Sequence, residues 1–249
     1  MSEHPILHKI RQAAVDSEIS RFNWRDRGRG PIGYYKGLAL TYGRVFCKFK
    51  AVDPIAKDIA AAVGNNPNSD ALAFLNNEFA SIGLGQTAAG LAVLRKVFVL
   101  LTGLGMRESS GRYCEGRDRS TDNTTADEAE AGLFQTSFNA HSASSRLDQL
   151  FTQYRRSPDG FAEAFQQGVS CSAEDLENFG IGDGAEFQRL SKACPAFAVE
   201  FAAVGVRCLR RHWGPINRGE VQLRAESEAL FRAVENLVVA TPDAATALL

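Results

Sequence analysis

The sequence predicts a mainly α-helical protein folded as one domain. Apolar residues recur at helical spacing along most of the 249-residue chain, beginning with Ile6, Ile10 and Ala13. Residues that start and stop helices punctuate this pattern, such as Asp53-Pro54 and then Gly64. No internal repeat, low-complexity tract or linker divides the chain. We therefore expect a single domain over residues 1–249.

The N-terminal half is expected to be a series of helices that leads to a buried one. These helices are predicted over residues 4–22, 36–50, 54–64, 69–79 and 87–105. The Gly- and Arg-rich stretch 23–35 is expected to be a loop around which Trp24, Tyr34 and Tyr35 pack. The helix at 87–105 carries only two charged residues and is apolar nearly all round. That pattern predicts a central, buried helix.

The C-terminal half is expected to be helical as well, after a loop or small β-hairpin region at about 110–138. Its helices are predicted at about 143–155, 158–167, 172–180, 184–211 (divided by Pro195) and 219–239. Residues 241–249 are expected to be a frayed tail. The core of the domain would then be residues 86–240, and residues 1–85 would add an N-terminal helical layer whose role the sequence leaves open.

The bulk composition excludes several classes of partner. A net charge of -1 gives no overall field that would attract nucleic acid or an anionic membrane. No apolar run approaches the roughly 20 residues that a membrane span needs. The oligomeric state stays open.

The N-terminal residues and the cysteines bear on location. The N-terminal segment lacks the apolar region and the cleavage site of a signal peptide, so we expect synthesis in the cytoplasm, with release or a non-classical route of export if the target lies outside. The five scattered cysteines are expected to be reduced thiols, mostly buried. Cys194 and Cys208 are expected in the core, and Cys114, in the polar loop, is the accessible one.

Glu108 is the candidate for acid–base chemistry. It follows the buried helix, at the end where the backbone dipole disfavours negative charge. Leu104 and Met106 would reduce its hydration. Both effects raise the pKa of a carboxyl, as a general acid requires. The alternative is a surface glutamate paired with Arg107 or Arg112.

Two short motifs in order resemble the lysozyme-like superfamily, most closely the goose-type lysozymes and related lytic transglycosylases. Arg107-Glu108-Ser109 matches the motif that ends the central helix in that family. Gly132-Leu133-Phe134-Gln135 matches the segment that follows across a polar hairpin region, with Phe in place of Met. The resemblance covers roughly residues 90–215.

The resemblance implies a lysozyme-like helical fold and cleavage of the β-1,4 bond between N-acetylmuramic acid and N-acetylglucosamine. Glu108 would be the general acid, Ser109 would line or support the site, and Gln135 would contact the substrate. The partner would be a glycan polymer, peptidoglycan or a chitin-like chain. No cofactor and no metal are expected.

For the second carboxylate the chain departs from the family, because Ser137 stands where goose-type lysozymes have an aspartate. Asp118, Asp122 and Asp127 are candidates in the preceding loop, and Asp122 with Asp127 is the preferred pair for positioning water. An inverting hydrolase needs such a group about 6.5–9.5 Å from the acid. Without it, the chain would be a lytic transglycosylase or a catalytically silent protein that binds glycan or another protein. Chitin or chitosan is the alternative polymer.

Other residues near the motifs have weaker signals. Tyr113 would stack on a sugar ring or anchor the loop. His141 would face the cleft or be a surface or hydrogen-bonded histidine, and Ser137 would face the cleft. Asp118, Ser120, Asp122 and Thr124 have the alternate spacing of a calcium loop, but its sixth and twelfth positions are Asn123 and Ala129. A solvated acidic loop is therefore the better interpretation.

Overall fold

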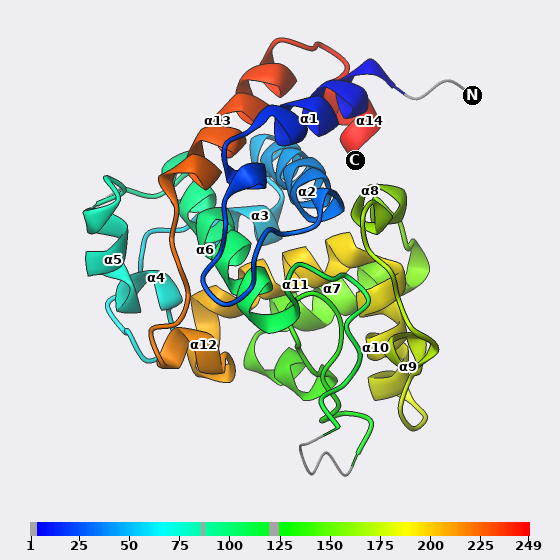
Figure 1. Cartoon of the computed structure of the whole chain (residues 1–249). Coiled ribbons are helices and arrows are strands. Elements are labelled where there is room, and N and C mark those ends of the chain that lie inside the picture. The colour runs from blue at the N-terminus through cyan, green and yellow to red at the C-terminus, as the bar shows by residue number, and fades with distance from the viewer. Residues whose placement is uncertain (1–3, 86–87, 120–124) are drawn as a thin grey trace.

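The computed structural model describes residues 4–85, 88–119 and 125–249. Within these ranges every regular element is a helix (Figure 1). The β-pairing recorded there consists of two isolated bridges, Trp24 with Gly28 and Ala131 with Thr136. The mainly helical class is therefore confirmed.

The first half of the chain forms helices up to the central one. Their bounds are α1 Pro5–Asp16, η1 Ile19–Arg21, α2 Ile32–Lys50, α3 Pro54–Ile59, α4 Ala71–Phe74, α5 Asn76–Ser81 and α6 Leu91–Ser109. Asp53 caps α3 by accepting from the Ala56 N–H at 2.9 Å, as its position before a proline predicts.

The second half continues as helices and short 3₁₀ segments. Their bounds are η2 Phe138–Ala143, α7 Ser145–Arg156, α8 Ala162–Gln166, α9 Ala173–Leu176, α10 Asp183–Ala193, α11 Pro195–Cys208, η3 Arg210–His212, α12 Gly214–Asn217, α13 Ala225–Val239 and α14 Ala244–Leu248. Pro195 begins α11, as predicted. Ser172 and Asp175 form the predicted capping box of α9.

Helix α6 is buried along nearly its whole length, and it contacts α2, α3, α11, α12 and α13 (Figure 1). Close packing requires small residues on it. A Cβ at Gly105 would lie 2.5 Å from the Tyr34 hydroxyl oxygen. That hydroxyl lies 2.7 Å from the Thr102 carbonyl oxygen, so it crosses α6 at this point.

Two boundaries differ from the sequence prediction. Helix α2 begins at Ile32, so Tyr34 and Tyr35 lie on a helix and not in a loop. Gly33 packs where its Cβ would be 2.5 Å from the Phe165 carbonyl oxygen, a contact that only the folded chain reveals. Helix α6 runs on to Ser109, which places Glu108 inside its last turn rather than after it.

The prediction of a frayed C-terminal tail is wrong. Residues Ala244–Leu248 form α14, in which Leu248 is fully buried. Helix α14 packs on α1 and α2, and Arg44 donates to the Leu248 carbonyl at 2.8 Å. Helices α1 and α2 also pack on α13, and α2 contacts α6 and α11, so the N-terminal layer and the tail share one core with the rest.

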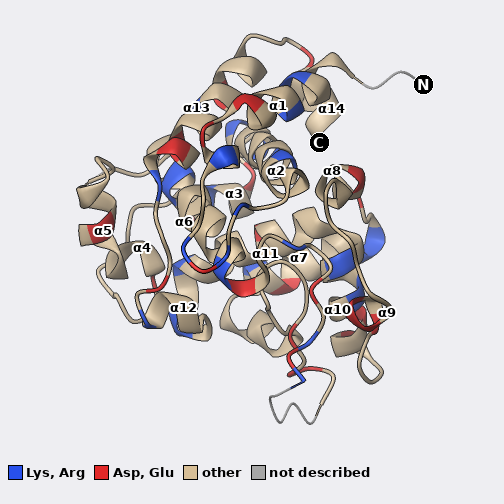
Figure 2. Ribbon diagram, viewed as in Figure 1, with Lys and Arg blue, Asp and Glu red and all other residues tan. Residues whose placement is uncertain are grey.

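Charged residues of both signs are interspersed over the ribbon (Figure 2). Some of them form buried pairs between helices: Arg95 of α6 pairs with Glu228 and Glu235 of α13, each at 2.9 Å. None of the described helices has the length and apolarity that crossing a bilayer demands.

Candidate functional site

Helix α6 holds Glu108 in its last turn, where the chain then reverses sharply. Ser110 adopts a left-handed conformation with φ 55°, and Gly111 follows with φ 76°. The Gly111 N–H donates to the Gly105 carbonyl at 3.1 Å, which closes the helix. The Glu108 side chain therefore projects from a fixed helix end.

Ser109 supports the site from behind and does not line it. Its side chain is buried, and its hydroxyl lies 3.1 Å from the Gly105 carbonyl oxygen and 2.9 Å from that of Leu133. This contact joins the end of α6 to the GLFQ segment. The two motifs thus meet in space.

The GLFQ segment is a tight, pinned turn. The Ala131 N–H donates to the Thr136 carbonyl at 3.0 Å, and Gly132 and Gln135 both have positive φ. The indole N–H of Trp213 donates to the Phe134 carbonyl at 3.0 Å. These bonds fix the backbone at Gln135.

A cavity of about 430 Å³ opens beside Glu108, and we call it the Glu108 cavity. Its walls come from the end of α6, the loop after it, the residues around the GLFQ turn, and α9. The described residues that line it are Glu108, Glu115, Gly116, Arg117, Asp118, Arg119, Glu130, Gln135, Glu174 and Asp175.

Burial dominates the electrostatics of Glu108. The pKa of its carboxyl is raised to about 8, first by desolvation and second by the nearby Glu130 carboxylate, against the opposing effect of Arg218, Arg27 and Arg107. The alternative of a surface ion pair is not what the structure shows. Arg107 pairs with Glu220 at 3.0 Å, and Arg112 pairs with Glu115 and Asp175.

The sequence prediction missed Glu115 and Glu130, two further carboxyls of the cavity whose pKa is raised. Burial raises the pKa of both, and Asp118 adds to the effect at Glu130. Glu130 stands two residues before the GLFQ motif, so its proximity to that motif was a signal that could have identified it.

The aspartates chosen from the sequence lie differently. Asp118 lines the cavity, but Asp127 is not among the described residues that do. The Asp127 carboxylate lies against Gly184 at the start of α10, 2.5 Å from where a Cβ would stand. Asp122 lies outside the described residues, as do Ser120 and Thr124 of the suggested calcium loop.

Three predicted substrate-contacting residues, Tyr113, Ser137 and His141, take part in local structure and are not among the residues recorded along the cavity. The Tyr113 hydroxyl lies 3.3 Å from Cys171 Sγ. Ser137 donates to the Asn139 side chain at 2.7 Å, and the His141 ring stacks on Phe138 with centroids 4.2 Å apart.

A disulfide joins Cys114 to Cys171, with Cα atoms 6.1 Å apart, so the prediction of reduced thiols is wrong for this pair. Cys114 is also fully buried rather than accessible. The pairing spans 57 residues, a relation that spacing alone does not reveal. The bond links the loop after α6, which forms one wall of the Glu108 cavity, to the segment that leads into α9, which forms another.

The α9 wall has a second anchor in Lys192 of α10. Its buried ammonium donates to the carbonyls of Asp175 at 3.0 Å and Glu177 at 2.5 Å. Burial lowers the pKa of Lys192 to about 8, and Asp175 and Glu177 oppose that shift.

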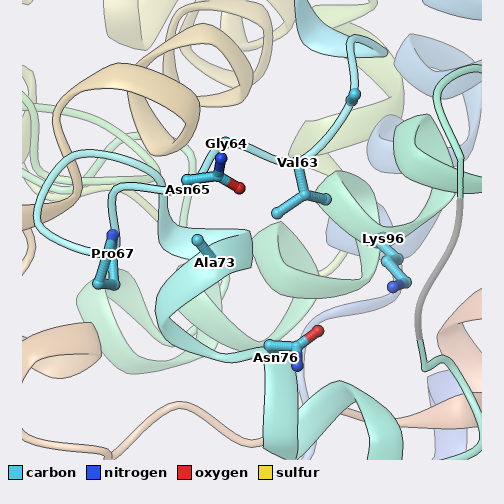
Figure 3. A pocket seen from close by; sticks show the side chains of 8 residues that line it. Val63, Gly64, Asn65, Pro67, Ala73, Asn76 and Lys96 are labelled. Atoms are coloured by element: carbon cyan, nitrogen blue, oxygen red, sulfur yellow. The ribbon is translucent and has the colours of Figure 1, made fainter.

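A second cavity of about 430 Å³ lies near the start of α6, where Lys96 lines it with Val63, Asn65, Pro67, Ala73 and Asn76 (Figure 3). Lys96 is buried and donates to the Gly85 carbonyl. Its ammonium also lies 5.4 Å from the centroid of the Phe79 ring.

In comparisons with known proteins, no protein-family model, curated protein or solved structure matches the chain. Within the described residues, no group of three or more His, Cys, Asp or Glu side chains is placed to hold a metal ion. The carboxyls and the polar walls of the Glu108 cavity are therefore the features that bear on function.

Proposed function

We propose that this protein is a lysozyme-like glycosidase that cleaves the β-1,4 bond between N-acetylmuramic acid and N-acetylglucosamine of peptidoglycan. Glu108 is the general acid that protonates the glycosidic oxygen. Gln135 and the polar residues of the opposite walls bind the sugar hydroxyls and amides.

One observation carries this proposal: a carboxyl whose pKa lies near 8 stands on a cavity of about 430 Å³. A general acid must keep its proton at the pH at which it works, and burial achieves this for a carboxyl. The ordinary pKa of a glutamate, 4.5, would leave it ionised at neutral pH.

The surroundings of Glu108 fit a glycan. The cavity is lined by charged and amide side chains that can donate to and accept from sugar hydroxyls. Its supporting residues are rigid: the Ser109 hydroxyl ties the helix end to the GLFQ turn, and the disulfide ties the loop to the α9 segment. Catalytic groups need such preorganised support.

A second candidate substrate is a glycan with free amino groups, such as chitosan. The described lining of the cavity holds six carboxyls against two arginines, an excess that favours a cationic ligand. The carboxyls are those of Glu108, Glu115, Asp118, Glu130, Glu174 and Asp175.

The test is turnover of dye-labelled peptidoglycan by the wild type and by Glu108→Gln, with chitosan as the second substrate. We expect at least a 1,000-fold loss for the variant, because the amide has no proton to give. The matched control is Glu186→Gln, which changes a partly exposed carboxylate paired with Arg189 on α10, away from the cavity. Equal turnover by Glu108→Gln and wild type, or no turnover of either polymer by the wild type, would contradict the proposal.

A further inference from the structure

Glu130 is the second carboxylate that the Glu108 cavity offers for catalysis. It lines the same cavity from a different wall, the segment that enters the GLFQ turn. It also lies close enough to Glu108 for its charge to be the largest influence on that carboxyl after burial.

The Glu130 carboxyl differs from most other acids of the cavity in its partners. Arginine pairs with Glu115 at 3.2 Å, with Asp175 at 2.5 Å and with Glu174 at 3.6 Å. Among the described residues, no hydrogen bond or ion pair is recorded for the side chain of Glu130. A half-buried carboxyl without a partner is costly, so it points to a role toward a ligand or water.

The backbone aims the Glu130 side chain. Its neighbours Ala129 and Ala131 are both buried, at 0% and 1% exposure, whereas the Glu130 side chain between them is half-buried and lines the cavity. The Ala131 N–H donates to the Thr136 carbonyl, and the next N–H, that of Gly132, donates to the Glu115 carbonyl at 2.8 Å. Glu130 is thereby fixed where it meets the cavity.

We infer that Glu130 is the general base that activates the attacking water, which makes this protein a hydrolase rather than a lytic transglycosylase. This inference rests on the proposed function. A transglycosylase would need no such base, because the substrate supplies its own nucleophile.

Glu108 gives its proton to the glycosidic oxygen, and the bond from that oxygen to the anomeric carbon breaks. The oxygen of one water forms a bond to the same carbon while Glu130 takes a proton from that water. Glu108 ends as a carboxylate and Glu130 as a carboxylic acid, and exchange with solvent restores both.

The experiment compares Glu130→Gln with Glu108→Gln and with the wild type on peptidoglycan, with products read by mass spectrometry. We expect a 100- to 10,000-fold loss of turnover for Glu130→Gln, the range for a lost general base. Wild-type products should carry reducing ends. The matched control is Glu128→Gln on the same segment, an exposed residue whose carboxylate accepts from Thr125 at 3.0 Å and which should keep wild-type turnover.

Two further measurements do not depend on how well Glu130→Gln folds. NMR of the first wild-type product should show inverted anomeric configuration. For Glu130→Ala, sodium azide should restore turnover and yield a glycosyl azide of inverted configuration, because the small anion needs no base.

Several results would overturn the inference. One is turnover of Glu130→Gln within about twofold of wild type, or a change in its pH optimum alone. The others are anhydro-muramic products or retained anomeric configuration in the products of the wild type. Each leaves the proposed function intact as long as Glu108→Gln is inactive. An active Glu108→Gln would instead remove the proposed function itself.

Discussion

The two ends of α6 hold two desolvated charges in contrasting surroundings. Lys96 and Glu108 are twelve positions apart, about 18 Å along the helix, and each lines a cavity of about 430 Å³. Burial lowers the pKa of Lys96 and raises that of Glu108, because it disfavours the charged form of each side chain.

The difference lies in their partners. Lys96 donates to the Gly85 carbonyl and lies over the Phe79 ring. For the Glu108 carboxyl, no hydrogen bond or ion pair is recorded among the described residues. Burial alone thus does not identify a functional group. A buried charge with protein partners stabilises the fold, and one without them is available to a substrate.

The neighbouring residues Arg95 and Lys96 test how much a buried charge depends on its protein partners. Arg95→Met should lower the free energy of unfolding by about 3 kcal/mol, because it leaves the half-buried Glu235 carboxylate without its cation and leaves the buried Glu228 with only the exposed Arg232. Lys96→Met should change it by no more than about 1 kcal/mol, since one lost hydrogen bond is offset by relief of desolvation. Urea unfolding measures both. Equal losses would show that Lys96 is as tightly integrated as Arg95.

The walls of the Glu108 cavity should depend on the disulfide. Replacing Cys114 and Cys171 together by serine should cost about 2–4 kcal/mol of stability and lower glycan turnover, because two walls lose their link. Thermal unfolding and turnover are the measurements. Dithiothreitol should affect the wild type in the same way and leave the double variant unchanged. Unaltered turnover in the reduced wild type would separate the disulfide from the site.

Lys192→Met should have a smaller effect on the same walls. It leaves the carbonyls of Asp175 and Glu177 without their donor, at a cost of about 1–3 kcal/mol. Because these residues belong to the α9 wall, KM should rise more than kcat falls. The control is Lys36→Met, an exposed contact to Gln167. A fall in kcat with unchanged KM would argue against this positioning role.

The stability of the chain should also depend on pH. The pKa of Glu108 is near 8 in the folded chain against 4.5 ordinarily, so between these values the folded chain binds more protons than the unfolded one. Wild-type stability should therefore fall relative to Glu108→Gln as pH rises from about 4.5 to about 8. Thermal unfolding at pH 5, 7 and 9 measures this difference. A difference that does not change with pH would contradict the raised pKa of Glu108.

Local patterns predicted the helices and the acid at the end of α6. The apolar run from Val97 to Met106 requires burial on all sides, and Glu108 is the first acidic residue after it. Contacts between distant segments were not predictable in this way. The Cys114–Cys171 bond, the packing of Leu248 and the approach of Glu130 to Glu108 each depend on how separate segments fold together.

The absence of Glu130 from the sequence prediction illustrates the limit. The resemblance directed attention to aspartates in the loop. The position of Glu130 instead depends on the two buried alanines that flank it and on the hydrogen-bonded turn that follows. Spacing in the sequence shows which residues are near a motif, and only the backbone shows which way they point.

The central claim is that Glu108 stays protonated at neutral pH, and direct titration of its carboxyl tests it. Carbon NMR of protein labelled at the glutamate side-chain carboxyl, compared with Glu108→Gln to assign the signal, follows this group across pH 3 to 10. A midpoint of about 8 is the predicted result. A midpoint near 4.5 would mean that Glu108 is ionised at neutral pH and would contradict its role as the general acid.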